Sequence, residues 1–126
     1  MGGEERLIAE TFADLSTDWP GAFRLTDDCA AIEPASGQAL VVKTDPIRSG
    51  VHFLADDAPA DIAWKALAVN VSDLVAKSAR PLAYLIAISF PAMPTAEWLR
   101  EFADGLRSAQ DAFGMTLIGG DTDRAE

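Results

Sequence analysis

The sequence contains a single cysteine, a single histidine and a single tyrosine, and it has only 10 basic residues against 20 acidic ones. Because Cys29 is the only cysteine, no disulfide can form within the chain, which is typical of a protein from a reducing compartment. No signal peptide is predicted, because the first fifteen residues contain three glutamates and no long apolar core. The longest apolar stretch, Leu82 to Ile88, is too short to span a bilayer. We therefore expect a cytoplasmic protein.

The excess of acidic residues limits the partners that the chain can have. A formal net charge of −10 argues against nucleic acid and against anionic membrane surfaces, since both attract basic patches. Such an excess fits either a solvated surface or carboxylates gathered to hold divalent cations. With 126 residues, 49% of them hydrophobic, the chain has the size and composition of one globular domain, residues 1–126.

Hydrophobic periodicity and turn residues predict the order α-β-β-α-β-α-β. The last helix is predicted to begin after an N-cap at Thr95 and to stop at Gly114. A glycine-rich turn, Gly119-Gly120-Asp121-Thr122, is expected after the last strand. We expect an α+β fold in which a mixed or antiparallel sheet carries two long helices on one face. The helices are predicted over 4–15, 61–79 and 95–113, and the clearest strands over 39–44, 82–90 and 115–118.

The helix predicted over residues 61–79 holds an unusual acidic residue. From Ile62 to Ala76 this helix is apolar on nearly every side, which predicts that it is buried. Asp73 lies within this run, where a carboxylate is costly unless it is paired or bound to a metal. One interpretation is an i,i+4 ion pair between Asp73 and Lys77, or a cap for a neighbouring loop. The other is that Asp73 is a metal ligand.

Three further acids, Asp28, Asp45 and Asp121, flank strand ends or glycine turns. Strand ends at one edge of a sheet can bring such residues together with Asp73. Converging carboxylates repel one another unless they bind hard cations through oxygen. Magnesium commonly bridges carboxylates to nucleotide phosphates, and glycine turns let backbone N–H groups approach phosphate. The pattern favours a magnesium and nucleotide site, whereas a lone histidine such as His52 is more often a surface or packing residue.

Several short stretches form a recognisable set: Asp27-Asp28-Cys29-Ala30, Thr44-Asp45, Gly50-Val51-His52-Phe53, Trp64 to Leu74, and Gly119-Gly120-Asp121-Thr122. In this order and spacing they resemble the N-terminal domain of bacterial thiamine-monophosphate kinases, within the aminoimidazole-ribonucleotide-synthetase-like superfamily. The resemblance covers nearly the whole chain. The loop at His52-Phe53 and the central helix favour the kinases over their superfamily relatives.

The resemblance implies that ATP phosphorylates thiamine phosphate to thiamine diphosphate, with Mg²⁺ as the cofactor. Metal charge and positioning would carry catalysis, and no side chain is assigned as a general base. The family fold also implies a homodimer, in which the N-terminal sheet packs against its mate. The implied metal ligands are Asp28, Thr44, Asp45, Asp73 and Asp121, the implied nucleotide contacts are Gly120 and Asp121, and His52 is placed near the thiamine phosphate.

The sequence departs from the family pattern at three places. Thr26 replaces a glycine, Lys43 replaces a small hydroxyl residue beside Thr44, and Lys77-Ser78 replaces Met-Gly. An ammonium group near the carboxylates would compete with magnesium. We also expect these 126 residues to lack the family's second domain. The chain is thus expected to be the N-terminal nucleotide- and magnesium-binding part of a thiamine-phosphate kinase, or alternatively a non-catalytic module for dimerisation or nucleotide binding.

Overall fold

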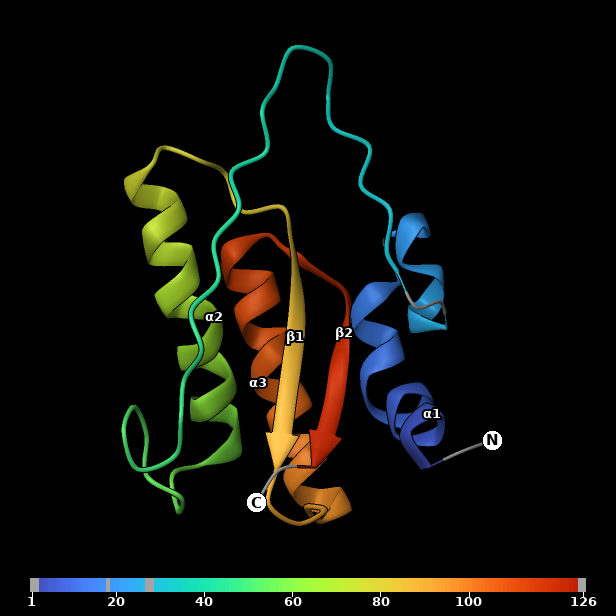
Figure 1. Ribbon diagram of the computed structural model, residues 1–126, viewed down its shortest axis with the longest axis vertical. Coiled ribbons are helices and arrows are strands. Elements are labelled where there is room, and N and C mark those ends of the chain that lie inside the picture. The colour runs from blue at the N-terminus through green and yellow to red at the C-terminus, as the bar shows by residue number, and fades with distance from the viewer. Residues whose placement is uncertain (1–2, 18, 27–28, 125–126) are drawn as a thin grey trace.

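The computed structural model describes residues 3–17, 19–26 and 29–124. Its main elements are α2 (Pro59–Ala76), β1 (Ala83–Phe90), α3 (Ala96–Phe113) and β2 (Thr116–Arg124). Short helical turns precede them, namely α1 (Gly3–Leu7), η1 (Ile8–Phe12), η2 (Ala13–Ser16) and η3 (Pro20–Leu25). Figure 1 shows α3 behind the two strands, α2 on the side of β1, and the N-terminal turns on the side of β2. Within the described ranges, no helix is long and apolar enough to cross a membrane.

The two strands form a parallel sheet, in which β1 pairs with β2. The prediction of a mixed or antiparallel sheet is therefore wrong. The cause is the connection between the strands: α3 carries the chain from the end of β1 back to the beginning of the sheet. A crossover of this kind aligns the two strands in the same direction. The expectation that two long helices accompany a sheet is confirmed.

Strand β2 continues through the glycine-rich segment that was predicted to be a turn. Gly120 pairs with Ile86 and Asp121 pairs with Ala87, and the register shifts by one residue just before these pairs. Gly120 has a φ of +146°, and a β-carbon at this position would collide with the backbone of Ile86. A glycine within a strand often marks such a close backbone approach. The strand pairing alone therefore requires glycine at position 120.

Residues 31–46, which we call the arm, form no strand. Every residue of the arm is exposed, and Figure 1 shows the arm rising beyond the sheet and then descending along α2. The strand predicted over 39–44 is thus wrong for this chain. Its β-branched residues favour extended backbone, but a strand also needs a neighbour to pair its N–H and C=O groups. Among the described residues, β1 pairs only with β2.

Helix α3 begins and ends as its sequence predicts, whereas α2 spans Pro59–Ala76 and ends three residues before the predicted Ala79. Pro59 occupies the first turn of α2, and the Thr95 hydroxyl caps α3 by accepting a hydrogen bond from the backbone N–H of Trp98 at 3.0 Å. Gly114 ends α3 in the left-handed conformation, with φ of +71°. The helices approach closely at Gly105, where a β-carbon would collide with the backbone of Ala60. Glycine therefore sets the contact between α2 and α3.

One hydrophobic core joins both helices, one face of the sheet and the N-terminal turns. The prediction that α2 is buried on nearly every side is wrong, because the side opposite the core is open: Trp64 is 40% exposed and Val75 is 58% exposed. The buried members of the core are Phe12, Leu15, Ile62, Ala63, Leu67, Val71, Leu99, Phe102, Leu106, Ala109, Met115 and Leu117.

The side chain of Gln110 in α3 connects the helix to three other elements. Its Oε1 atom accepts hydrogen bonds from the Tyr84 hydroxyl at 2.7 Å and from the Leu117 backbone N–H at 3.1 Å. Its Nε2 atom donates to the Leu15 carbonyl at 3.3 Å. Burial raises the pKa of Tyr84 above its ordinary value, which keeps the hydroxyl protonated as a donor. A single amide thus ties β1, β2 and η2 to α3.

We predict that Gln110→Leu destabilises the protein by about 1–3 kcal/mol, because it leaves partly buried donors without an acceptor. Urea denaturation followed by circular dichroism measures the change. Arg100→Leu is the control, because Arg100 is exposed on the same helix and its replacement is expected to cost less than about 0.5 kcal/mol. Equal losses in the two variants would contradict a special role for Gln110.

Gly120→Ala should destabilise the protein by about 1–3 kcal/mol or more, because the new methyl group meets rigid backbone at a strained φ. Gly119→Ala provides a matched control at the neighbouring position. Its methyl group would meet the flexible end of the Leu85 side chain at 3.1 Å, which can move aside. Thermal unfolding of the two variants should therefore show a much larger drop in Tm for Gly120→Ala. A larger drop for Gly119→Ala would contradict the observed register.

Candidate functional site

Two of the predicted metal ligands, Asp45 and Asp73, lie on either side of a lysine. The Nζ atom of Lys43 lies 3.2 Å from Oδ2 of Asp45 and 3.2 Å from Oδ2 of Asp73. Lys43 and Asp45 belong to the arm, whereas Asp73 lies in the last turn of α2. The three side chains are 34%, 43% and 51% exposed, so water still reaches them. We call these three residues the Lys43 bridge.

The Lys43 bridge bears on the ion pair that was one interpretation of Asp73. Asp73 pairs with Lys43 across the fold, and Lys77 forms no ion pair within the described part of the chain. The proposed i,i+4 pair with Lys77 is therefore wrong. Hydrogen bonds to Asp45 and then to Asp73 raise the pKa of Lys43 above its ordinary value, so the bridging group is an ammonium ion.

Asn70, one turn before Asp73 on α2, holds the arm at the same place. Its Nδ2 atom donates hydrogen bonds to the Asp45 carbonyl at 3.3 Å and to the Ala66 carbonyl at 2.9 Å. Its Oδ1 atom is buried and accepts no hydrogen bond from the described residues. No role was predicted for Asn70 from the sequence, although an amide inside an apolar helix is a usable signal. Asn70 therefore fixes the backbone of Asp45 against α2.

The remaining predicted metal ligands do not complete a cluster. Among the described residues, no three His, Cys, Asp or Glu side chains are grouped so that they could hold a metal ion. Asp121 is exposed in the second half of β2, and the C-terminal ends of β2 and α2 point to opposite ends of the molecule in Figure 1. Thr44 is exposed in the arm beside Lys43. Asp28 lies outside the described residues.

His52 lies in the loop before α2, and backbone contacts fix it there. Its Nδ1 atom accepts a hydrogen bond from the Arg48 backbone N–H at 2.9 Å, and its carbonyl oxygen accepts one from the Lys65 ammonium. This loop lines a hollow of about 250 Å³, formed by Gly50, Val51, His52, Phe53, Leu54 and Asp57. Lys65, the one cation within α2, brings positive charge to this loop, although no role was predicted for it from the sequence.

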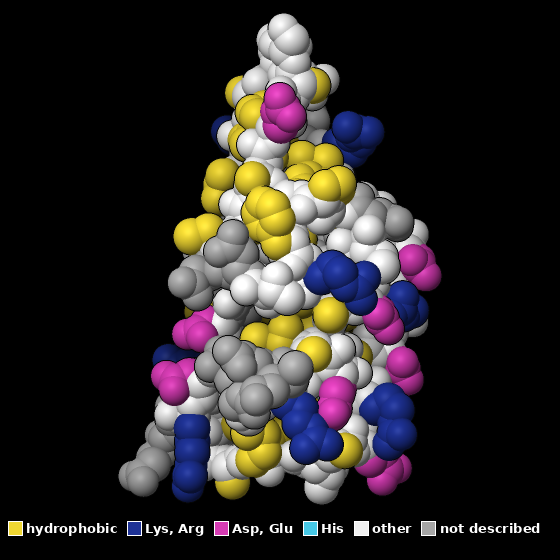
Figure 2. All heavy atoms as spheres, turned by 90° about the vertical axis from the view of Figure 1, so that its right-hand side faces the viewer, with side chains coloured by type: hydrophobic (Ala, Val, Ile, Leu, Met, Phe, Trp, Pro, Cys, Tyr) yellow, Lys and Arg dark blue, Asp and Glu magenta, His cyan; other side chains and the backbone are white. Residues whose placement is uncertain are grey.

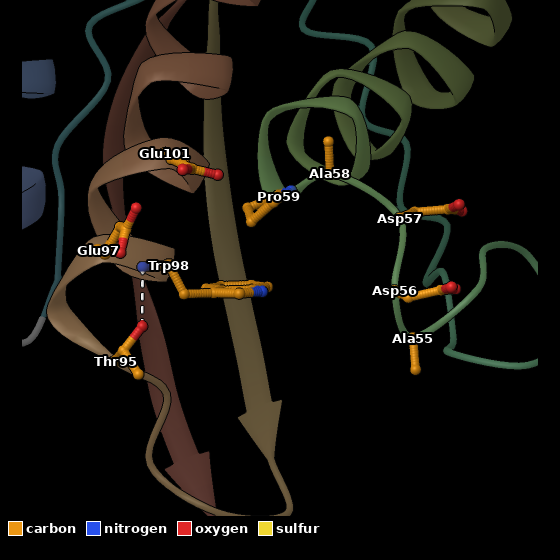
Figure 3. Close-up of a pocket in the computed structure, with 9 residues that line it drawn as sticks. All are labelled: Ala55, Asp56, Asp57, Ala58, Pro59, Thr95, Glu97, Trp98 and Glu101. Atoms are coloured by element: carbon orange, nitrogen blue, oxygen red, sulfur yellow. Dashed lines mark hydrogen bonds between the residues drawn. The ribbon is translucent and has the colours of Figure 1, made fainter.

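A second hollow, of about 290 Å³, lies between the loop before α2 and the first turns of α3 (Figure 3). The ring of Trp98 projects from α3 toward the loop, and Glu97 and Glu101 lie on the same helix near it. Asp56 and Asp57 line the loop side. Four carboxylates would repel a phosphate group. None of the predicted site residues lines this hollow.

The bridge as it stands does not fit a magnesium ion. Magnesium needs oxygen ligands at about 2.0–2.1 Å in octahedral geometry. Oδ2 of Asp45 and Oδ2 of Asp73 both lie 3.2 Å from the ammonium of Lys43. An adjacent positive charge also opposes a second cation at the same oxygens. Magnesium could use this pair only after Lys43 had moved away.

Comparison with known proteins places the chain in a family. Residues 26–126 match the family described as "AIR synthase related protein, N-terminal domain". Thiamine-monophosphate kinase from Escherichia coli K12 is 42% identical over 123 residues, which cover 97% of this chain and 38% of the relative. The enzyme of the same name from Salmonella typhimurium is 45% identical over 123 residues. The chain thus spans less than half the length of these relatives.

Solved structures show the same relationship. The crystal structure of thiamine-monophosphate kinase from Stenotrophomonas maltophilia K279a has a TM-score of 0.74 and 43% identity, and the match covers 79% of this chain and 31% of that one. A structure described as AaThiL complexed with AMPPCP and TMP has a TM-score of 0.59 and 32% identity, over 62% of this chain and 25% of that one. The chain belongs to the AIR synthase related family, whose N-terminal domain it matches, and within that family it resembles thiamine-monophosphate kinases.

Proposed function

We propose that the chain is the N-terminal part of a thiamine-phosphate kinase, which uses ATP to phosphorylate thiamine phosphate to thiamine diphosphate. The observation that carries this proposal is the 42% identity to the E. coli enzyme over 123 residues. A related structure complexed with AMPPCP, an analogue of ATP, and with TMP supports the same pair of substrates. Residues 1–126 would then supply one domain of the enzyme.

The positive charges around the loop at His52 support a role in binding a phosphate group. The chain as a whole is strongly acidic, so an anionic substrate needs a local site of positive charge. Lys65 provides an ammonium at this loop and Arg48 lies on it, so two cations stand against one acid, Asp57, which lines the same hollow. His52 would lie near thiamine phosphate, and Gly120 and Asp121 near the nucleotide. No side chain of the described residues is proposed as a general base.

A second candidate function is a non-catalytic module that retains the fold for dimerisation or nucleotide binding. The Lys43 bridge favours this alternative, because it places an ammonium between two carboxylates that the family resemblance assigns to magnesium. Magnesium therefore remains part of the proposal for the kinase and is supported by the family resemblance, not by the arrangement of Asp45 and Asp73.

The proposed homodimer is supported by exposed apolar surface on the arm and on β1. Leu40, Val41 and Val42 of the arm are 46%, 46% and 88% exposed, and Leu85 of β1 is 67% exposed. Figure 2 shows hydrophobic side chains over the upper half of one face, interspersed with a few charged ones, while more of the charged side chains lie over the lower half. Apolar surface of this kind, next to a sheet with an unpaired edge, favours pairing with a second copy.

The kinase proposal is tested by a chimera in which residues 1–126 replace the matching segment of the E. coli enzyme. We expect the chimera to form thiamine diphosphate from ATP and thiamine phosphate, with kcat/KM within about tenfold of the parent enzyme. Residues 1–126 assayed alone should be inactive, because phosphoryl transfer needs both reactants held in line. A folded but inactive chimera would favour the non-catalytic module.

Self-association is tested by sedimentation velocity at micromolar concentration. We expect wild type to form dimers, and the double variant Val42→Ser/Leu85→Ser to shift toward monomer because it removes exposed apolar surface. Val75→Ser is the control, since Val75 is also more than half exposed but lies on α2. A monomeric wild type would contradict the proposed dimer, and an equal effect of Val75→Ser would exclude the arm and β1 as its interface.

A further inference from the structure

The arm is held to the rest of the fold at both ends: Ala31 at its N-terminal end forms hydrogen bonds with Trp19 and Gly21, and its C-terminal end contacts α2. The arm has no strand partner and is exposed throughout. Two kinds of side-chain contact reach it from α2: the ion pair from Asp73 to Lys43, and the hydrogen bond from Asn70 to the Asp45 carbonyl. The arm is thus attached to α2 through the residues that form the Lys43 bridge.

We propose that Lys43 is a tethered counter-ion that competes with divalent cations for Asp45 and Asp73. In the absence of a divalent cation, its ammonium holds the two carboxylates together. A divalent cation binds the pair only by displacing Lys43, so this lysine lowers the affinity of the site. This inference rests on the proposed function in one respect, which is that the enzyme is expected to use a divalent cation.

The geometry makes the two cations mutually exclusive. Lys43 contacts Oδ2 of Asp45 and Oδ2 of Asp73 at the same distance, 3.2 Å, so it lies between them. A metal ion that bridges these oxygens at about 2.0–2.1 Å would occupy nearly the same space. Two carboxylates with one ammonium carry a net charge of −1, which attracts a divalent cation less strongly than the −2 of the carboxylates alone.

Displacement of Lys43 would not separate the two carboxylates. The hydrogen bond from Asn70 to the Asp45 carbonyl is independent of the Lys43 side chain, and it keeps Asp45 next to α2. Asp73 is fixed by the helix itself. Lys43 is exposed enough to swing into water when a metal ion takes its place. The exchange therefore needs a change of the lysine side chain only.

The test compares Lys43→Met with Lys77→Met, which each remove one positive charge. Lys77 lies close to Asp73 in sequence but forms no ion pair with the described residues, so it controls for the general effect of charge. Binding of Mn²⁺, without nucleotide or thiamine phosphate, is measured by electron paramagnetic resonance at low ionic strength. We expect Lys43→Met to bind Mn²⁺ about tenfold more tightly than wild type, and Lys77→Met to differ by less than about threefold.

Two further variants identify the site. Lys43→Arg keeps the positive charge and should bind Mn²⁺ no more tightly than wild type. Asp73→Asn added to Lys43→Met should abolish the gain in affinity. Circular dichroism checks that each variant is folded, and Lys43→Ser serves as a second neutral replacement should Lys43→Met unfold.

Equal affinities of wild type and the neutral Lys43 variants would overturn the proposal. So would equal gains from Lys43→Met and Lys77→Met, or a gain that survives Asp73→Asn. These results are separable from the test of the kinase. An active chimera with no effect of Lys43 would contradict only the counter-ion, whereas an inactive chimera with the expected Mn²⁺ affinities would contradict only the kinase.

Discussion

The fold depends on the parallel pairing of β1 with β2. Because parallel strands cannot be joined by a tight turn, α3 must cross between them, and this places the apolar face of α3 against the sheet. Helix α2 then packs against α3 at Gly105. The same pairing fixes Gly120 against Ile86, so that one strand contact determines both the helix layer and a glycine of the Gly119-Gly120-Asp121-Thr122 segment.

The candidate site depends on a different and weaker set of contacts. Asp73 is held by a helix whose buried face belongs to the core, whereas Asp45 and Lys43 belong to an arm without a strand partner. Their proximity is maintained by one ion-pair bridge and one amide hydrogen bond. Such exposed contacts can open without loss of the core. The site can therefore rearrange around a ligand while the fold stays intact.

Much of the fold could be predicted from local sequence. Both long helices carry clear signals, such as the Thr95 cap and the glycine at position 114, and their cores follow the expected apolar positions. The absence of a strand over 39–44 and the direction of the sheet could not be predicted in this way, because both depend on which segment pairs with which.

For the site, the sequence indicated that Asp45 and Asp73 converge, but it did not show that Lys43 would lie between them. The partner of a charged group is set by tertiary contacts, and the nearest lysine along the helix, Lys77, was the wrong one.

The physical reason for Asp73 thus differs from the reason suggested by its neighbours in sequence. An acid within an apolar helix is costly only if the helix is buried on that side, and α2 is open there, because the Asp73 side chain is 51% exposed. Asp73 therefore needs no metal ion for its own stability. Asp45 approaches it all the same, and two carboxylates brought together from an arm and a helix repel each other unless a cation lies between them. The chain itself supplies that cation as Lys43. Lys43 departs from the family pattern, and this departure was first expected to weaken a metal site. Electrostatically, its ammonium allows the arm and α2 to meet without a metal ion.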